Sequence, residues 1–296
     1  MASASAIVWG GGDFSGGVAV KAAGGTMRSA FRVVLISHTI SLTILLLLTL
    51  IWGGPHPSGV TVAWGLVAGI LAALSLTTFY VALSGGAMGA AAALSGLLAA
   101  AIPAVVSSYT EGVPGALRLV GFVVAGVAIW LIAAGPAHPP GATHPEAPLP
   151  ASRRAMLLAI AAGVGFGLYF VAMKMAGRGG LLWPMTTVRI GSAATCAILV
   201  LATLRSRNPP VVAPSTGYLP RKAVLWALGP AFLDTCGNLL FMAATRMGRL
   251  DIAAVLASLY PASTILLAAW MFHERPTRGQ GLGMLVAAAA VVMISL

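Results

Sequence analysis

The sequence predicts an all-α integral membrane protein of ten transmembrane helices, arranged as two inverted five-helix repeats. Three observations predict this fold. Only 8% of the 296 residues are charged and 59% are hydrophobic, and the mean hydropathy of +0.96 is too high for a domain with a water-exposed surface. Ten apolar runs are long enough to cross a bilayer. The two halves of the chain also resemble each other in sequence.

The apolar runs define the expected helices in order. A helix rises about 1.5 Å per residue, so about 20 residues cross a hydrocarbon core about 30 Å thick. Runs of this length, bounded by glycine, proline or charge, predict spans at 2–20, 29–52, 61–83, 88–110, 115–135, 155–174, 182–204, 223–245, 252–272 and 278–296. Most connections are short, so neighbouring helices should be antiparallel with no soluble domain between them.

Two longer connections, 136–154 and 205–222, are rich in proline and predict extended linkers. The first divides the chain into a five-helix repeat at 1–135, the linker at 136–154 and a second five-helix repeat at 155–296. Residues 6–24 match residues 159–177 at nine of nineteen positions. Further along, two pairs share an offset of 163, Ser95 with Ser258 and Glu111 with Glu274. Because each repeat has an odd number of spans, the second should insert upside down, as in many transporters.

The net charge of +11 raises the question of a nucleic-acid partner. The 17 lysines and arginines, however, stand singly or in pairs at the ends of apolar runs, with no basic stripe interleaved with aromatic residues. This distribution is typical of residues that meet lipid headgroups. We therefore expect membrane lipid as a partner and no nucleic acid.

Two of the six acidic residues, Asp13 and Asp234, are expected near the membrane midplane. A charge at that depth costs about 2.5 to 3.5 kcal/mol on insertion scales, so such residues usually face a cavity or a partner. Trp9 shares a helical face with Asp13, and Asn238 follows Asp234 by one turn. These four side chains are candidates for binding a solute or a proton. The alternative is a structural carboxyl that is protonated or paired with arginine.

Other polar residues have two possible interpretations. His38 lies mid-span and could relay protons, although a buried and satisfied histidine is the more common case. A second group of basic residues could contact the substrate but is expected to consist of snorkelling anchors: Lys21 and Lys174 at helix ends, and Arg32 and Arg189 early in the following helices.

The stretch from Ser258 to Pro261 is the other candidate region. Tyr260 is expected to line the cavity together with Ser258. Pro261 and Pro103 are candidates for gating, because a proline inside a span loosens its helix. The remaining aromatic residues near helix ends are expected in the interfacial belt: Tyr80, Tyr169 and Trp183.

These motifs resemble a known family. The opening Trp9-Gly-Gly-Gly-Asp13-Phe-Ser-Gly-Gly17, the stretch Ser258-Leu-Tyr-Pro261 and the following His273-Glu274-Arg275-Pro276 resemble the EamA-like branch of the drug/metabolite transporter superfamily, as does the duplication. The resemblance implies ten helices around a central cavity, export of amino acids or other small metabolites, and a location in the bacterial plasma membrane. In one departure from symmetry, Leu98 takes the place that matches Pro261, and Pro103 follows five residues later.

No nucleotide-binding motif is present to power transport, so the sequence favours a secondary transporter for a small solute, either facilitative or driven by a gradient, with protons as a possible coupling ion. No cofactor or metal is expected. One alternative is a flippase for a lipid-linked intermediate. Another is an intramembrane enzyme, which is disfavoured because no His-Glu-x-x-His motif or carboxylate pair at one-turn spacing occurs.

Two arguments about membrane orientation disagree. The odd-numbered connections hold eleven lysines and arginines, against six in the even-numbered ones. By the positive-inside rule, the odd connections would be cytoplasmic and both termini outside. The family resemblance implies both termini inside. In either case the two termini should share one side of the membrane.

Overall fold

A computed structural model describes residues 1–54, 56–84, 88–133, 153–205, 219–272 and 277–296. All regular structure in these ranges is helical, and each predicted span contains a helix. The first half forms α1 (Ala2–Ala22), α2 (Met27–Trp52), α3 (Gly59–Ser84), α4 (Met88–Thr110) and α5 (Ala116–Ala133). The second half forms α6 (Arg153–Gly177), α7 (Leu182–Arg205), α8 (Arg221–Met247), α9 (Leu250–Ala257), α10 (Tyr260–Phe272) and α11 (Arg278–Ser295).

Five helices of the described chain are long and apolar enough to cross a membrane by length and composition: α2, α3, α6, α7 over Leu182–Leu204, and α8. Shorter apolar helices lie at four of the other predicted spans. The chain is therefore an all-helical, multi-pass integral membrane protein. The Pro-rich linker before residue 153, residues 206–218 of the second linker and the His273–Pro276 stretch lie outside the described residues.

Local sequence signals set several helix ends. Thr26 starts α2 with a capping box, in which its hydroxyl accepts a hydrogen bond from Ser29 N at 3.1 Å. Thr277 caps α11 in the same way through Gln280 N at 3.2 Å. Gly24 follows the end of α1 with a φ of 97°, a conformation that favours glycine.

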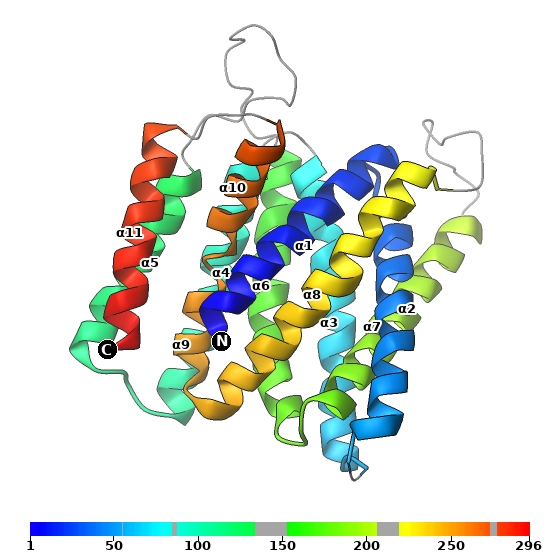
Figure 1. Ribbon diagram of the computed structural model, residues 1–296, viewed down its shortest axis with the longest axis horizontal. Coiled ribbons are helices and arrows are strands. Elements are labelled where there is room, and N and C mark those ends of the chain that lie inside the picture. The colour runs from blue at the N-terminus through cyan, green and yellow to red at the C-terminus, as the bar shows by residue number, and fades with distance from the viewer. Residues whose placement is uncertain (55, 85–87, 134–152, 206–218, 273–276) are drawn as a thin grey trace, which may run out of the picture.

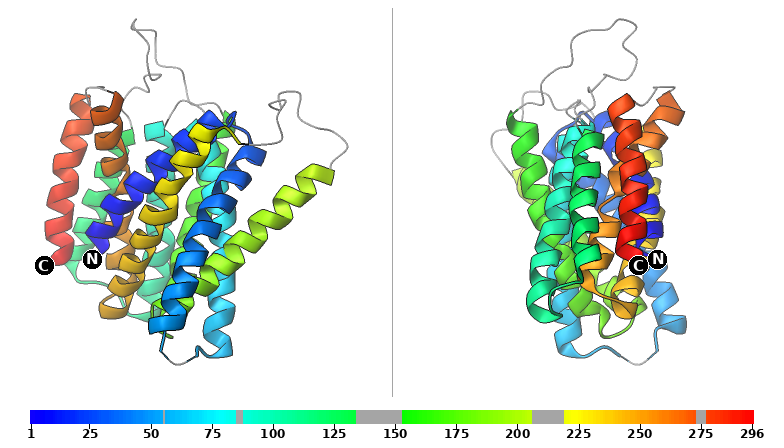
Figure 2. Two further views of the ribbon diagram at one scale, coloured as in Figure 1. Left: turned by 45° about the vertical axis from the view of Figure 1, so that its right-hand side comes forward. Right: turned by 90° about the vertical axis from the view of Figure 1, so that its left-hand side faces the viewer.

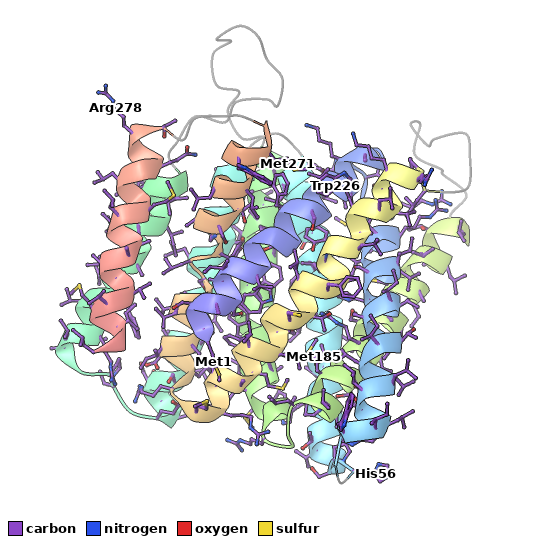
Figure 3. All side chains as sticks on the ribbon, viewed as in Figure 1. Met1, His56, Met185, Trp226, Met271 and Arg278 are labelled. Carbon is purple, nitrogen blue, oxygen red and sulfur yellow. The ribbon has the colours of Figure 1, made fainter. Side chains whose placement is uncertain are left out.

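The helices form one bundle in which the halves interleave (Figures 1 and 2). α1 packs against α8 and α10, and α3 packs against α6 and α7. At one edge of the bundle α5 packs against α11. Figure 3 places Met1 toward one end of the bundle and Arg278 at the other. The N- and C-termini lie at the same end (Figure 1).

The ninth predicted span is two helices rather than one. α9 ends at Ala257 and α10 begins at Tyr260, so the helix is interrupted two residues before Pro261. Proline has no N–H to donate to the preceding turn, and its ring crowds the carbonyl one turn earlier. α4, by contrast, continues through Pro103 to Thr110. The two halves therefore bend differently at this position.

Gly69 allows a close contact between α3 and α7. A Cβ atom added there would lie 2.7 Å from Ser192 N and 2.9 Å from Gly191 Cα, and both atoms belong to the backbone of α7. We expect Gly69→Ala to force the helices apart and lower the free energy of unfolding by about 1 to 3 kcal/mol. Gly59→Ala in the same helix is the control, because a Cβ atom there meets nothing within 4 Å. In detergent, the midpoint of thermal unfolding should fall for Gly69→Ala and stay unchanged for Gly59→Ala. Equal midpoints for the two variants would contradict the close contact.

Candidate solute-binding site

A small, partly open pocket with a cavity volume of about 30 Å³ lies between the two halves of the chain. Its lining comes from α1, α3, α6, α8 and α10. The residues that line it are Trp9, Asp13, Leu76, Phe166, Tyr169, Phe170, Asp234, Asn238 and Tyr260. Five of these nine residues were predicted from the sequence: Trp9, Asp13, Asp234, Asn238 and Tyr260.

Small residues bring α1 and α8 together at this pocket. A Cβ atom on Gly12 would lie 3.2 Å from Asp234 N, and one on Gly237 would overlap the indole of Trp9. Glycine at both positions lets the backbones approach closely. At that distance Trp9 Nε1 donates a hydrogen bond to Asn238 Oδ1 at 3.0 Å.

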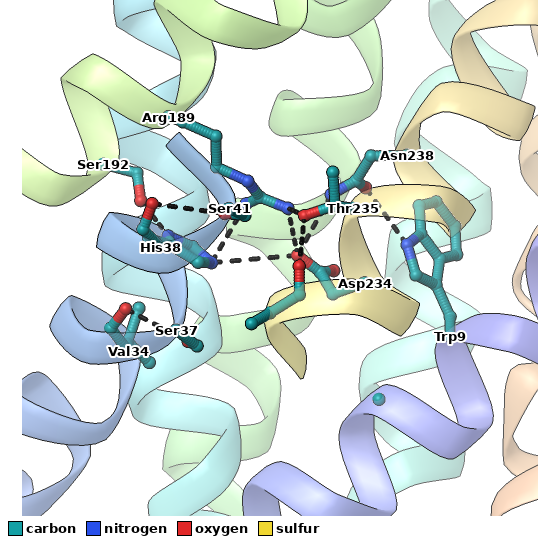
Figure 4. A network of polar contacts seen from close by, with 12 residues as sticks. Trp9, Val34, Ser37, His38, Ser41, Arg189, Ser192, Asp234, Thr235 and Asn238 are labelled. Atoms are coloured by element: carbon teal, nitrogen blue, oxygen red, sulfur yellow. Dashed lines mark hydrogen bonds and ion pairs between the residues drawn. The ribbon is translucent and has the colours of Figure 1, made fainter. Parts of the chain in front are cut away.

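Asp234 is paired with a buried arginine (Figure 4). Arg189 Nη2 donates to Asp234 Oδ2 at 2.6 Å and to Thr235 Oγ1 at 2.9 Å. Asn238 Nδ2 donates to the same carboxylate oxygen at 3.1 Å. The exposed fraction of Arg189 is 0%, so the prediction that it is a snorkelling anchor is wrong. The packing of α7 against α2 and α3 turns Arg189 inward, where it balances the Asp234 charge.

His38 contacts both members of this ion pair on the side away from the pocket. Its Nε2 lies 3.0 Å from Arg189 Nη1 and 3.7 Å from Asp234 Oδ2, and its Nδ1 contacts Ser192 Oγ. Because a guanidinium only donates hydrogen bonds, Nε2 must accept, and Nδ1 carries the hydrogen of a neutral ring. His38 is fully buried and does not line the pocket. In this arrangement it is a satisfied histidine that orients Arg189.

Asp13 differs from Asp234 in having no partner. It lines the pocket with an exposed fraction of 8%, and no hydrogen bond or ion pair joins its carboxylate to another residue that the structure describes. No basic residue is near Asp234 along the chain, so the sequence alone does not reveal its charge partner. In space, Arg189 neutralises Asp234, and Asp13 is the carboxylate left unpaired in the pocket.

Aromatic rings form much of the wall. Trp9 stacks on Phe170 with centroids 5.3 Å apart and planes 3° apart, and Phe170 lies 4.5 Å from Phe241. Tyr169 lines the pocket and is 4% exposed, and Tyr80 is fully buried, so the prediction that both belong to the interfacial belt is wrong. Both rings pack between helices rather than against lipid. Trp183 is half-buried and donates to the Gly54 carbonyl oxygen.

Near the break between α9 and α10, Tyr260 lines the pocket, and Ser258 does not. The Tyr260 hydroxyl lies 2.7 Å from Ser95 Oγ in α4. Ser258 is fully buried, and its hydroxyl has no hydrogen-bond partner in the described part of the chain. Pro261 is buried at the start of α10, and Pro103 is buried inside α4.

A cluster of charges joins three helix ends at the end of the bundle that holds the termini (Figure 1). Lys174 in α6 pairs with Glu111, which follows α4. Arg249, before α9, donates from Nη1 to the Glu111 carbonyl oxygen at 2.9 Å and pairs with Asp251 at 2.8 Å. The hydrogen bonds that Arg249 donates to the Asp251 carboxylate raise the pKa of Arg249, so that its positive charge is retained. Lys21, the repeat mate of Lys174, is exposed.

Phe166 is a pocket residue that the repeat could have identified. At the offset of 153 that aligns α1 with α6, Phe166 is the counterpart of Asp13. Both residues line the pocket. The candidate site therefore uses equivalent positions of the two halves, with a carboxylate on one side and a ring on the other.

A multi-pass helical bundle with an acid-bearing pocket enclosed between its two halves has the architecture of a membrane transporter. Residues 153–296 match the family model of the EamA-like transporter family, the family that the sequence resembles. The family is one of membrane transporters of small solutes. One crystal structure is similar in fold, with a TM-score of 0.69 and 17% sequence identity over 99% of this chain and 98% of the other. No curated protein matches the chain.

Proposed function

We propose that the chain is a secondary transporter that moves a small solute through the central pocket by alternating access. The observation that carries this proposal is the pocket between the two halves of the chain, which holds an unpaired carboxylate and aromatic rings from both halves. The cavity of about 30 Å³ has room for only about one or two water molecules, so we infer that the two halves move apart to admit a solute.

The packing pattern supports an inverted repeat. If α1 corresponds to α6 and α3 to α8, exchanging the halves converts the α1–α8 contact into the α6–α3 contact, and both occur. The matched glycines behave alike, since Gly12 faces α8 at Asp234 and Gly165 faces α3 at Ser75. Two halves related in this way can exchange conformations and open one site to either side in turn.

The cluster around Glu111 favours a state that is closed at the end with the termini. It joins the ends of α4 and α6 to the start of α9 through Lys174 and Arg249. No ion pair between described residues joins helices at the opposite end. We infer that breaking this cluster accompanies opening at that end. Export from the bacterial cytoplasm is the direction that the family resemblance favours.

The test is solute flux in proteoliposomes that contain the purified full chain. Radiolabelled probes of each charge class should be offered in counterflow: leucine, glutamate, lysine and 2-phenylethylamine. Protein-dependent exchange of at least one probe is expected. Failure to exchange any of them, by protein that is correctly folded and reconstituted, would overturn the transport proposal.

Pro261→Ala tests whether the break between α9 and α10 serves gating. The interruption leaves backbone carbonyls outside helical hydrogen bonding, where a solute or ordered water can use them. Removing the proline should favour a continuous helix and lower flux by about tenfold, the effect of about 1.4 kcal/mol on a conformational step. Pro103→Ala is the comparison, because α4 is already continuous, and its effect should be smaller. Equal flux for Pro261→Ala and the unmodified chain, at equal expression, would make Pro261 a tolerated kink.

A further inference from the structure

The charges around the pocket do not balance. Asp234 and Arg189 neutralise each other at 2.6 Å, and the hydrogen bonds of His38 indicate a neutral ring. The remaining charged group is Asp13, which is more than nine-tenths buried and has no partner among the described residues. An isolated carboxylate at this depth in a membrane is costly unless a proton or another cation accompanies it. The site therefore carries one net negative charge when it is empty and Asp13 is ionised.

The pocket offers no cation to an anionic solute. Its described lining contains no lysine or arginine, and Arg189 is fully buried behind Asp234. Two N–H donors of the lining are used within the protein, since Trp9 Nε1 donates to Asn238 and Asn238 Nδ2 donates one of its two hydrogens to Asp234. A carboxylate ligand would enter without a charged partner and beside Asp13. This excludes tight binding of a simple anion and disfavours a zwitterion.

The wall suits a cation with an apolar body. Trp9, Phe166, Phe170 and Tyr260 present rings, and the negative faces of aromatic rings attract ammonium groups. Tyr169 adds a hydroxyl that has no partner among the described residues and could accept a hydrogen bond from an ammonium N–H. A bare metal ion needs several oxygen or nitrogen ligands, and no group of three or more His, Cys, Asp or Glu side chains that could hold one occurs in the described residues.

We propose that the pocket binds an organic monocation, a protonated amine attached to an apolar or aromatic body, with the ammonium group on Asp13 and the body among Trp9, Phe166 and Phe170. This proposal rests on the transport function proposed above and names the substrate class of the same site. Asp13 supplies the charge, and the aromatic rings supply the selectivity for an apolar body over a hydrated inorganic cation.

Binding to the purified full chain, measured by isothermal titration calorimetry, tests the proposal without requiring flux. The probes are 2-phenylethylamine, its uncharged isostere 2-phenylethanol and the anion phenylacetate. We expect the amine to bind at least about tenfold more tightly than the alcohol, and the anion to bind most weakly. Sodium chloride at matched ionic strength should not compete. Equal affinity for the amine and the alcohol, tighter binding of the anion, or no amine binding by folded protein would each overturn the proposal.

Variants assign the effect to its residues. Asp13→Asn should remove the preference for the amine and leave the affinity for the alcohol within about twofold. Glu146→Gln, which removes a carboxylate from the sequence between α5 and α6, should keep the preference. Phe170→Leu keeps an apolar side chain without a ring. It should reduce the affinity for the amine by about threefold to tenfold more than the affinity for the alcohol. If Asp13→Asn has an unchanged unfolding temperature and still prefers the amine, the assignment to Asp13 is wrong.

The binding and flux results separate the two proposals. An amine that binds through Asp13 without protein-dependent counterflow of any probe would leave the substrate class standing and overturn transport. Counterflow of leucine or glutamate without amine binding would leave transport standing and overturn the substrate class.

Discussion

Replacing Arg189 by methionine is expected to cost the protein most of its folded population. Arg189 has an exposed fraction of 0% and donates to Asp234, Thr235 and His38. Methionine fills similar space but leaves the Asp234 carboxylate without a charge partner. Breaking a buried pair from one side costs about 3 to 5 kcal/mol, which is a large part of the stability of an ordinary domain.

Arg32→Met is the matched control, because Arg32 holds the corresponding place in the first half and is only half-buried. Its effect should stay within about 1 kcal/mol. The double variant Arg189→Met with Asp234→Leu should recover much of the loss, because a buried ion pair can often be replaced by apolar residues of similar volume. Thermal unfolding and the monodisperse fraction in detergent measure all three. If Arg189→Met is as stable as Arg32→Met, the ion pair has no structural role.

The depth of acidic residues along predicted spans was enough to identify much of the pocket. Asp13 and Asp234 were selected because few other positions could place a carboxylate near the midplane, and both line the pocket. Helical spacing then added Trp9 and Asn238, which hydrogen-bond each other across α1 and α8. These residues were predictable because the cost of a polar group in a membrane restricts it to a few environments.

The roles of Arg189, Tyr169 and Tyr80 could not be predicted in this way. In the predicted spans each lies within about two turns of an end, where headgroup contact is the common arrangement, and the packing of α3, α6 and α7 buries them. Apolar residues cover most of each helix, so the sequence does not mark which face meets a neighbour. For the same reason, the packing of α1 against α8 and of α3 against α6 could not be predicted from the sequence. Pro261 indicated that the helix is interrupted in this region. The interruption itself lies before Pro261, because α10 already begins at Tyr260.

Asp234→Asn is expected to lower transport strongly in the protein that folds, and like Arg189→Met it should lower the free energy of unfolding, because it breaks the buried ion pair from one side. An asparagine amide oxygen can replace the carboxylate oxygen that now accepts from Arg189 Nη2 at 2.6 Å and from Asn238 Nδ2 at 3.1 Å. The positive charge of Arg189 then has no negative partner beside it. The net charge of the site rises from one negative to zero, although Asp13 is unchanged.

This change of charge separates three possible roles for Asp234. If the solute is a cation held mainly by Asp13, the uncompensated Arg189 should weaken its binding by at least about tenfold, because a unit charge a few ångströms away in a poorly solvated site is worth more than about 1.4 kcal/mol. Gradient-driven accumulation and solute exchange should then fall together. If Asp234 instead carries protons, accumulation should be lost while exchange continues. A wild-type transport rate and pH dependence for Asp234→Asn would show that Asp234 has neither role.

Asp13→Asn, measured in parallel, should abolish both accumulation and exchange whatever the result for Asp234→Asn. It removes the carboxylate that faces the solute while the Arg189–Asp234 pair is intact.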